Sequence, residues 1–147
     1  MNKIILLVED NPDDQLLTKA ALEMNNILNE VVIAENGVEA LDFLNGRGKW
    51  EGRNTDDLPA LVLLDLNMPK MGGFDVLKHI RADPRTELLP VVILTTSKED
   101  RDLVDSYKNG ANSYVKKPVD FDEFTNAAKQ LGMYWLMVNE SPLVTRK

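Results

Sequence analysis

Short apolar runs recur along the chain, and each ends in polar or turn-forming residues. Residues 4–8, 61–64 and 91–94 are apolar without alternation, a pattern typical of strands that are buried on both faces of a parallel sheet. Residues 30–35 and 113–116 also favour strands. The pattern therefore predicts five strands, and the intervals between them leave room for helices.

Between the strands, apolar residues recur with the period of an amphipathic helix. In the first such stretch, Pro12 suits the first helical turn, and Asp13 and Asp14 suit the positive end of the helix dipole. Pro84 and Gly110 mark the ends of two later helices. The spacing predicts helices over residues 13–24, 37–44, 74–81, 98–109 and 120–138.

Strands thus alternate with helices, and no long repeat or low-complexity segment interrupts them. This alternation indicates an α/β fold, a single doubly wound five-stranded parallel sheet with five helices. We expect the flavodoxin-like strand order 2-1-3-4-5, in which the first and third strands are neighbours. The polar stretch 45–59 is predicted to be a long surface loop, whose Trp50 either contacts a partner or folds back over the base of the loop.

Carboxylates follow two of the strands at the point where each strand ends. Glu9 and Asp10 follow the first strand, and Asp65 follows the third. In the expected order these exits meet at the switch point where open α/β sheets bind ligands. Crowded carboxylates repel one another, so a hard divalent cation that prefers oxygen ligands, magnesium, is the expected means of keeping them ionised.

The last two strands add a hydroxyl and a cation to the same edge, because they end at Thr95 and Lys117. A hydroxyl and an ammonium beside a metal-bound carboxylate suit the transfer of a phosphoryl group to that carboxylate, since the transfer depends on positioning and charge neutralisation. Asp65 is the predicted acceptor. Each residue alone also has an ordinary structural role: an acidic strand end is often solvated, and Thr95 could cap the next helix.

Composition narrows the class of protein. At 147 residues, with 44% hydrophobic and 28% charged side chains, the chain has the size and balance of one globular domain. No apolar run is long enough to span a bilayer and there is no signal-peptide pattern, so we expect a cytoplasmic protein with no membrane partner. The absence of cysteine excludes thiolate metal sites. A net charge of −7 argues against nucleic acid as a partner.

Several motifs coincide with the predicted strand ends and turns: Val-Glu-Asp-Asn at 8–11, Leu-Leu-Asp-Leu-Asn-Met-Pro at 63–69 with Gly73, Val-Ile-Leu-Thr-Thr at 92–96, Gly-Ala-Asn-Ser-Tyr at 110–114 and Lys-Lys-Pro at 116–118. Through them the chain resembles a response-regulator receiver domain, the phospho-accepting half of a two-component system. The resemblance implies a receiver domain over residues 1–138 and a short tail at 139–147 without an output domain. It also implies a signalling protein that is not an enzyme.

The resemblance assigns roles around the acidic cluster. It implies that Asp65 is phosphorylated and that Asp10, Asp65 and the backbone carbonyl of Asn67 hold magnesium with the assistance of Glu9. The family more often has aspartate at the position of Glu9, and we expect the glutamate to preserve the metal site.

The resemblance also assigns a switch. Thr95 would move towards the phosphoryl group, Lys117 would be its counter-ion, and Tyr114 would be the aromatic switch residue. The peptide bond before Pro118 is expected to be cis, as is typical of the family, which would aim Lys117 into the site.

Within the family, the long loop before the third strand and the aromatic pair at 134–135 are most similar to the single-domain regulators paired with bacterial phytochrome kinases. The implied partner is a sensor histidine kinase, and the finer likeness points to a bacterial phytochrome. The single histidine, His79, lies off the apolar face of its predicted helix. We expect it to be a solvated helix residue, so the donor histidine must belong to the kinase.

The predicted final helix becomes apolar on all sides at residues 133–138. One sheet face cannot cover every side of a helix, so part of this surface is expected to meet another chain. Tyr134 and Trp135, with Tyr107 from the preceding helix, suggest a homodimer whose equilibrium is shifted by phosphorylation through Thr95 and Tyr114. The alternative is that the chain's own residues 142–144 cover this helix end.

Three functions other than a phosphorylated terminal regulator can be compared with the sequence pattern by the residues they need. The chain could be a relay intermediate, which the sequence does not distinguish from a terminal regulator. A passive receiver-like binding module is disfavoured because no site residue is missing. A haloacid-dehalogenase-type phosphatase needs an aspartate as general acid two residues beyond its nucleophile, and that position is Asn67, which cannot protonate a leaving group.

Overall fold

A computed structural model describes residues 4–25, 27, 29–66, 68, 70–95, 99–117 and 121–132. In this part of the chain, five parallel strands form one sheet in the order β2-β1-β3-β4-β5, which confirms the expected order. The strands are β1 (Ile5–Val8), β2 (Val31–Ala34), β3 (Leu61–Leu64), β4 (Val91–Thr95) and β5 (Ser113–Lys116). The helices are α1 (Pro12–Met24), α2 (Gly37–Asn45), α3 (Gly73–Ala82), α4 (Asp100–Lys108) and α5 (Phe121–Gly132), and a short 3-10 helix, η1, spans Gly48–Trp50.

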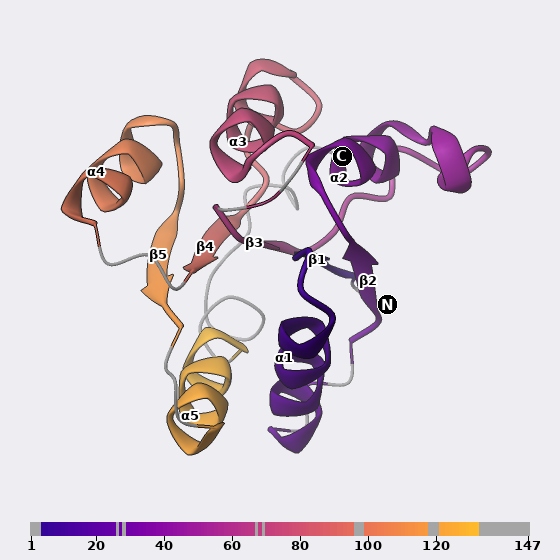
Figure 1. Cartoon of the computed structure of the whole chain (residues 1–147). Coiled ribbons are helices and arrows are strands. Elements are labelled where there is room, and N and C mark those ends of the chain that lie inside the picture. The colour runs from indigo at the N-terminus through magenta and orange to yellow at the C-terminus, as the bar shows by residue number, and fades with distance from the viewer. Residues whose placement is uncertain are drawn as a thin grey trace.

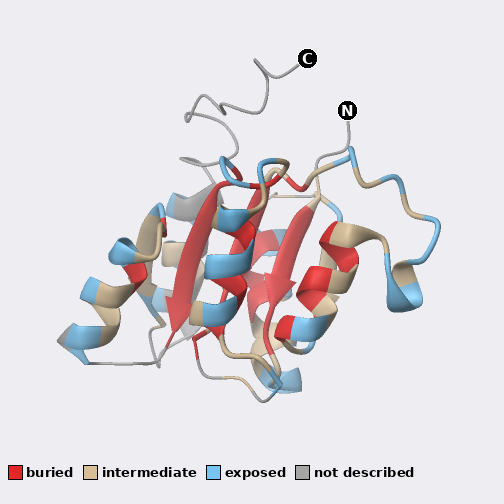
Figure 2. Ribbon diagram, turned by 90° about the horizontal axis from the view of Figure 1, so that it is seen from above, coloured by how far each residue is buried: buried red, intermediate tan, exposed pale blue. Residues whose placement is uncertain are grey.

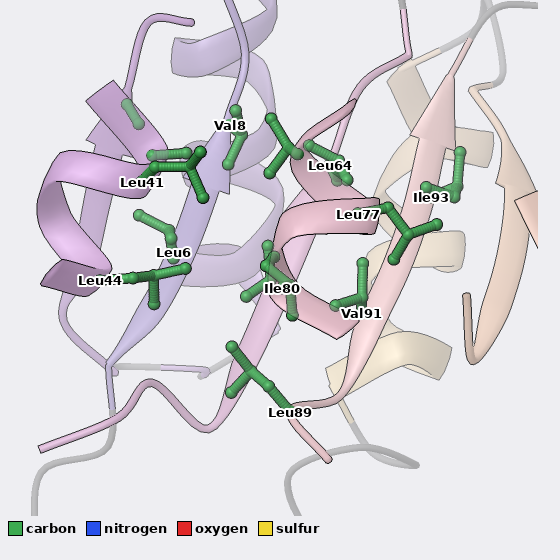
Figure 3. Packing of buried hydrophobic residues seen from close by; sticks show 14 of the residues in the cluster. Leu6, Val8, Leu41, Leu44, Leu64, Leu77, Ile80, Leu89, Val91 and Ile93 are labelled. Carbon is green, nitrogen blue, oxygen red and sulfur yellow. The ribbon is translucent and has the colours of Figure 1, made fainter. Parts of the chain in front are cut away.

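The helices cover both faces of the sheet, α1 and α5 on one face and α2, α3 and α4 on the other (Figure 1). Alternate residues of the central strands point to opposite faces. Leu6, Val8, Leu64 and Ile93 therefore pack with α2 and α3 in one buried cluster, part of which is shown in Figure 3. The intervening strand residues pack with Ala21 and Leu22 of α1 in a second cluster.

The three central strands are buried along their whole length, whereas the edge strands β2 and β5 are half-buried over most of theirs. Figure 2 shows the buried strands between partly exposed helices. The unbroken apolar runs in the sequence correspond to the central strands, because only these are covered on both faces. No helix in the described part of the chain is both long and apolar enough to cross a membrane.

Local signals fix the ends of the helices. The Asn11 side chain caps α1 by accepting hydrogen bonds from the backbone N–H groups of Asp13 and Asp14, at 2.9 and 3.1 Å. At the end of α3, Asp83 adopts an extended backbone (ψ 120°), as expected for the residue that precedes a proline. The helix predicted to begin at residue 98 is described from Asp100, with Glu99 at its cap position.

The 45–59 loop folds back on the domain. The Trp50 ring stands edge-on to Phe43 of α2, with 5.4 Å between ring centroids, which confirms the fold-back interpretation. The Arg85 guanidinium donates to the Thr55 carbonyl and to the Asn45 side-chain oxygen, at 2.8 and 2.9 Å. Arg85 therefore ties the loop to the domain at Asn45 and at Thr55.

Helix α4 is less buried than α1, α2 and α3, because Ser106 is its one buried side chain among those described. The outward side chains Val104 and Tyr107 are 49% and 51% exposed. Tyr107 is thus available on the surface predicted to meet a partner. Tyr134 and Trp135, the other members of that predicted face, lie outside the described residues, as do Asn67 and Pro118.

Candidate functional site

Three carboxylates meet at the carboxyl edge of the sheet. Glu9 and Asp10 follow β1, Asp65 follows β3, and these strands pair directly, with Val8 opposite Leu64. The Asp65 N–H donates to the Val8 carbonyl at 3.1 Å, which holds the two strand exits together. One ligand atom from each of Glu9, Asp10 and Asp65 lies within 4.8 Å of the others. The structure thus brings together the acidic residues that the sequence placed at one edge.

Glu9 is the most buried member of this cluster, with only 1% of its surface exposed. Burial raises the pKa of Glu9 to about 7, even though the neighbouring Lys117 ammonium favours the ionised form. The Gln15 side chain donates to the Glu9 carbonyl at 2.6 Å, and the Asn11 N–H donates to Glu9 Oε2 at 3.4 Å. These contacts join the first turn of α1 to the end of β1.

Lys117 enters the acidic cluster from the end of β5. Its backbone N–H donates to the Thr95 carbonyl at 2.7 Å, and its side chain is only 5% exposed. The ammonium donates to Glu9 Oε1, and it lies 3.3 Å from Asp14 Oδ2 and 3.9 Å from Asp65 Oδ2. Burial alone would lower the pKa of Lys117, but the contacts with these carboxylates outweigh it and raise the pKa. Lys117 is therefore held as a cation.

Thr95 and Tyr114 lie on adjoining strands beside the cluster. Thr95 is completely buried at the last position of β4, where it pairs in register with Lys116. Tyr114 lies opposite Ile93 on β5, and it packs against the apolar cluster on the α2 and α3 face. Thr95 thus lies at the edge of the sheet that carries the carboxylates, and Tyr114 lies on the neighbouring strand.

The connection from β3 to α3 brings backbone close to Asp65. Lys70 and Met71 both adopt positive φ, 48° and 70°, which is unfavourable for residues with side chains. A Cβ atom on Gly73 would lie 2.4 Å from the Asp65 carbonyl oxygen. Gly73 is therefore required for close approach of α3 to the residue after β3, although the sequence suggested only a turn.

The residues at this edge fit a hard divalent cation. Carboxylate oxygens are the ligands that such ions prefer, and three of them converge from two strands whose register is fixed. The Lys117 ammonium contacts Glu9 and lies 3.9 Å from Asp65 Oδ2, so it already offsets part of their negative charge. A metal would compensate the remaining negative charge in the same place.

Comparison with known proteins identifies the family. The family model described as response regulator receiver domain matches residues 5–129. The chain belongs to the response-regulator receiver family. The acidic edge of the sheet is therefore the corner at which receiver domains bind a divalent metal.

Individual relatives agree with this assignment. Response regulator Rcp1 of Synechocystis is 36% identical over 91% of this chain and 89% of its own length. The phosphorylated cyanobacterial phytochrome response regulator RcpA superposes with a TM-score of 0.88 at 35% identity, covering 97% of this chain and 99% of RcpA. The bacteriophytochrome response regulator AtBRR is 48% identical with a TM-score of 0.76, covering 95% and 99%. The receiver fold is thus shared with regulators described as belonging to phytochromes.

One of these relatives also bears on the metal. A structure described as the Mn²⁺-bound form of Rcp1 superposes on this chain with a TM-score of 0.85 at 35% identity, covering 95% of this chain and 99% of Rcp1. A homologous protein of the same fold therefore takes a divalent cation.

Sequence reasoning missed one residue that the structure places at the site. Asp14 was assigned only to the helix dipole, yet its carboxylate contacts Lys117 at 3.3 Å. Its place in the first turn of the helix that follows Glu9 and Asp10 was the available signal.

Proposed function

We propose that this protein is a phospho-accepting response regulator, in which Asp65 receives a phosphoryl group from a sensor histidine kinase. The observation that carries the proposal is the convergence of Asp65 with Glu9, Asp10 and the buried Lys117 ammonium at one corner of a receiver fold. A relative of the same fold is described as phosphorylated, which supports this reading.

The transfer needs an acceptor, charge neutralisation and a leaving group. An Asp65 carboxylate oxygen attacks the phosphorus atom of a phosphohistidine, the phosphorus–nitrogen bond breaks, and the imidazole nitrogen keeps the electron pair. The product is an acyl phosphate on Asp65. Lys117, whose ammonium lies 3.9 Å from Asp65 Oδ2, is placed to neutralise charge on a phosphoryl oxygen. Thr95 would supply a hydroxyl to another such oxygen.

Magnesium is the proposed metal. Glu9, Asp10 and Asp65 would hold it, and the Asn67 carbonyl would complete the set as the family resemblance implies. Few protein ligands leave magnesium open positions for water and for a phosphoryl oxygen. When bound, the ion would neutralise negative charge on the phosphoryl group and on the three carboxylates beside it.

The output is proposed to be a change of conformation and of dimer state. Phosphorylation would draw Thr95 towards Asp65 and reposition Tyr114, the switch residue. The face that includes exposed Tyr107, together with Tyr134 and Trp135, would form the homodimer. Trp135→Glu should shift the sedimentation mass from dimer to monomer, whereas an unchanged mass would count against a dimer at this face.

A histidine kinase is the proposed donor because no described residue supplies a phosphohistidine at the site. His79 is exposed on α3, and its Nδ1 lies 2.7 Å from the Asp75 carbonyl oxygen of its own helix. Structural relatives of this chain include proteins described as phytochrome response regulators. We therefore propose a bacterial phytochrome as the kinase and the cytoplasm as the compartment.

Three other functions are possible for a site of this kind. Phosphatase activity is disfavoured because an amide, Asn67, occupies the general-acid position. A passive binding module would use the fold without accepting phosphate. A relay intermediate would use the same transfer chemistry and pass the group to a further histidine.

The proposal can be tested with a phosphoryl analogue. Beryllofluoride added with Mg²⁺ should shift the amide resonances of Asp65, Thr95 and Lys117 in ¹⁵N-labelled protein. Asp65→Asn should show no such shifts, because it cannot coordinate beryllium as the carboxylate does. A folded wild-type protein whose resonances remain unchanged at saturating analogue and metal would contradict the proposal.

A further inference from the structure

The Lys117 ammonium is shared between more carboxylates than phosphoryl transfer requires. It contacts Glu9 and Asp14 and lies near Asp65, all within 4.0 Å. An ammonium has three N–H donors but only one positive charge, so three carboxylates share the charge of one buried cation. The distance to Asp14 Oδ2, 3.3 Å, is shorter than the distance to Asp65 Oδ2, 3.9 Å.

Asp14 differs from the other two carboxylates in one respect. Glu9 and Asp65 belong to the group whose oxygens converge as a metal site, and Asp14 does not. A metal bound by Glu9 and Asp65 would reduce the attraction of these residues for Lys117. Asp14 would then be the carboxylate partner that still holds the lysine towards α1.

Asp14 is also fixed in place. Asn11 caps the first turn of α1 through the N–H groups of Asp13 and Asp14, and Gln15 anchors that turn to the Glu9 carbonyl at 2.6 Å. The side chain of Asp14 is 35% exposed. It therefore gives up less hydration beside Lys117 than a fully buried carboxylate would.

We propose that Asp14 is a positioning residue that draws the Lys117 ammonium away from Asp65, so that metal binding is strengthened and phosphoryl binding is weakened. This inference rests on the proposed phospho-accepting function. Without Asp14, more of the lysine's charge would fall on Glu9 and Asp65, where it competes with a metal ion. The same charge would be free to pair with a phosphoryl group on Asp65.

The test compares Asp14→Asn with Asp13→Asn. Asp13 lies one position earlier in the same helical turn and is exposed. Both substitutions remove one negative charge near the helix N-terminus, so their effects on helix stability are matched. Mg²⁺ affinity is measured by calorimetry without phosphate, and beryllofluoride affinity is measured by NMR titration at saturating Mg²⁺.

Asp14→Asn should bind Mg²⁺ more weakly and beryllofluoride more tightly than wild type, each by about two- to fivefold, the range expected for a partly exposed ion pair. Asp13→Asn should leave both affinities near wild type. Asp14→Glu, which keeps the carboxylate, should also leave them near wild type. A merely structural role for Asp14 would weaken both ligands together. That outcome, or equal affinities in the two asparagine variants, would overturn the inference.

The outcomes also separate this inference from the proposed function. If wild type binds beryllofluoride and the Asp14 and Asp13 variants behave alike, the function stands and the role of Asp14 is overturned. If folded wild type binds no beryllofluoride at saturating Mg²⁺, the phospho-accepting function fails and the inference fails with it.

Discussion

Replacing Gly73 with alanine should damage the site while leaving its charged residues untouched. A Cβ at this position would lie 2.4 Å from the Asp65 carbonyl oxygen, 2.8 Å from the Leu66 Cα and 3.1 Å from the Asp65 carbonyl carbon. All three are backbone atoms, so no side-chain rotation can relieve the overlap. Ordinary contact begins near 3.4 Å. Either α3 or the backbone at Asp65 must therefore move by about 1 Å, a shift that in an active site can lower a rate by about 100-fold.

The stability effect follows from the same overlap. Overpacking of this kind costs about 1–3 kcal/mol, and the reduced flexibility of the unfolded chain returns about 0.4–1 kcal/mol. The net cost is therefore up to about 2.6 kcal/mol, and at roughly 2–4 °C per kcal/mol for a chain of this size Gly73→Ala should lower the melting temperature by up to about 10 °C. It should also weaken Mg²⁺ binding and slow phosphorylation by acetyl phosphate.

Gly72→Ala provides the matched control. Gly72 has φ of −70°, and the nearest atom to its added Cβ would be the Leu66 carbonyl oxygen at 3.4 Å. The added Cβ therefore causes no overlap. The expected loss of stability is no more than about 1 kcal/mol and comes from the weaker N-cap preference of alanine. Both variants are compared by thermal melting, Mg²⁺ titration and phosphorylation rate. A Gly73→Ala protein that matches Gly72→Ala in all three would refute the close-approach argument.

Further predictions concern the buried charges. Because burial raises the pKa of Glu9 to about 7, the metal-free fold keeps a proton that the unfolded chain releases near 4.5. The free energy of unfolding without metal, measured by urea titration, should therefore fall as pH rises from 5 to 7. Mg²⁺ affinity should rise over the same pH range. In Glu9→Gln the free energy of unfolding should not show this fall. Arg81 donates hydrogen bonds to three backbone carbonyls and to Asn112, at 2.7–3.0 Å. Arg81→Met should lower the free energy of unfolding by about 2–4 kcal/mol, measured by calorimetry or urea titration, because these acceptors lose their donor. The control is Arg101→Met at an exposed position, which should lower it by less than about 0.5 kcal/mol. Equal losses in the two variants would contradict this role of Arg81.

The sheet could be predicted from the sequence because its central strands are covered on both faces. β1, β3 and β4 appear as unbroken apolar runs, and a parallel sheet then brings their carboxyl ends to one edge. The meeting of Glu9, Asp10 and Asp65 followed from this topology alone. Their convergence needed only the strand order, which the structure confirms.

Other contacts had no sequence signal of comparable strength. The link between Lys117 and Asp14 depends on how α1 docks against the end of β1, which Gln15 fixes through a backbone carbonyl. Arg85 holds the 45–59 loop partly through the Thr55 carbonyl. Every residue has a backbone carbonyl, so the sequence does not indicate which carbonyl will accept a hydrogen bond from an arginine. Gly73 was recognisable as a glycine, but its reason is packing against Asp65 and not a positive φ.

The central claim is that Asp65 accepts a phosphoryl group in a metal-dependent reaction. Intact mass spectrometry after incubation with acetyl phosphate tests it directly, on wild type with Mg²⁺, wild type with a chelator, and Asp65→Asn with Mg²⁺. The account predicts one added phosphoryl group, of about 80 Da, in the first sample and none in the other two. A folded wild-type protein that shows no adduct with Mg²⁺, or an Asp65→Asn protein that is labelled equally, would contradict it.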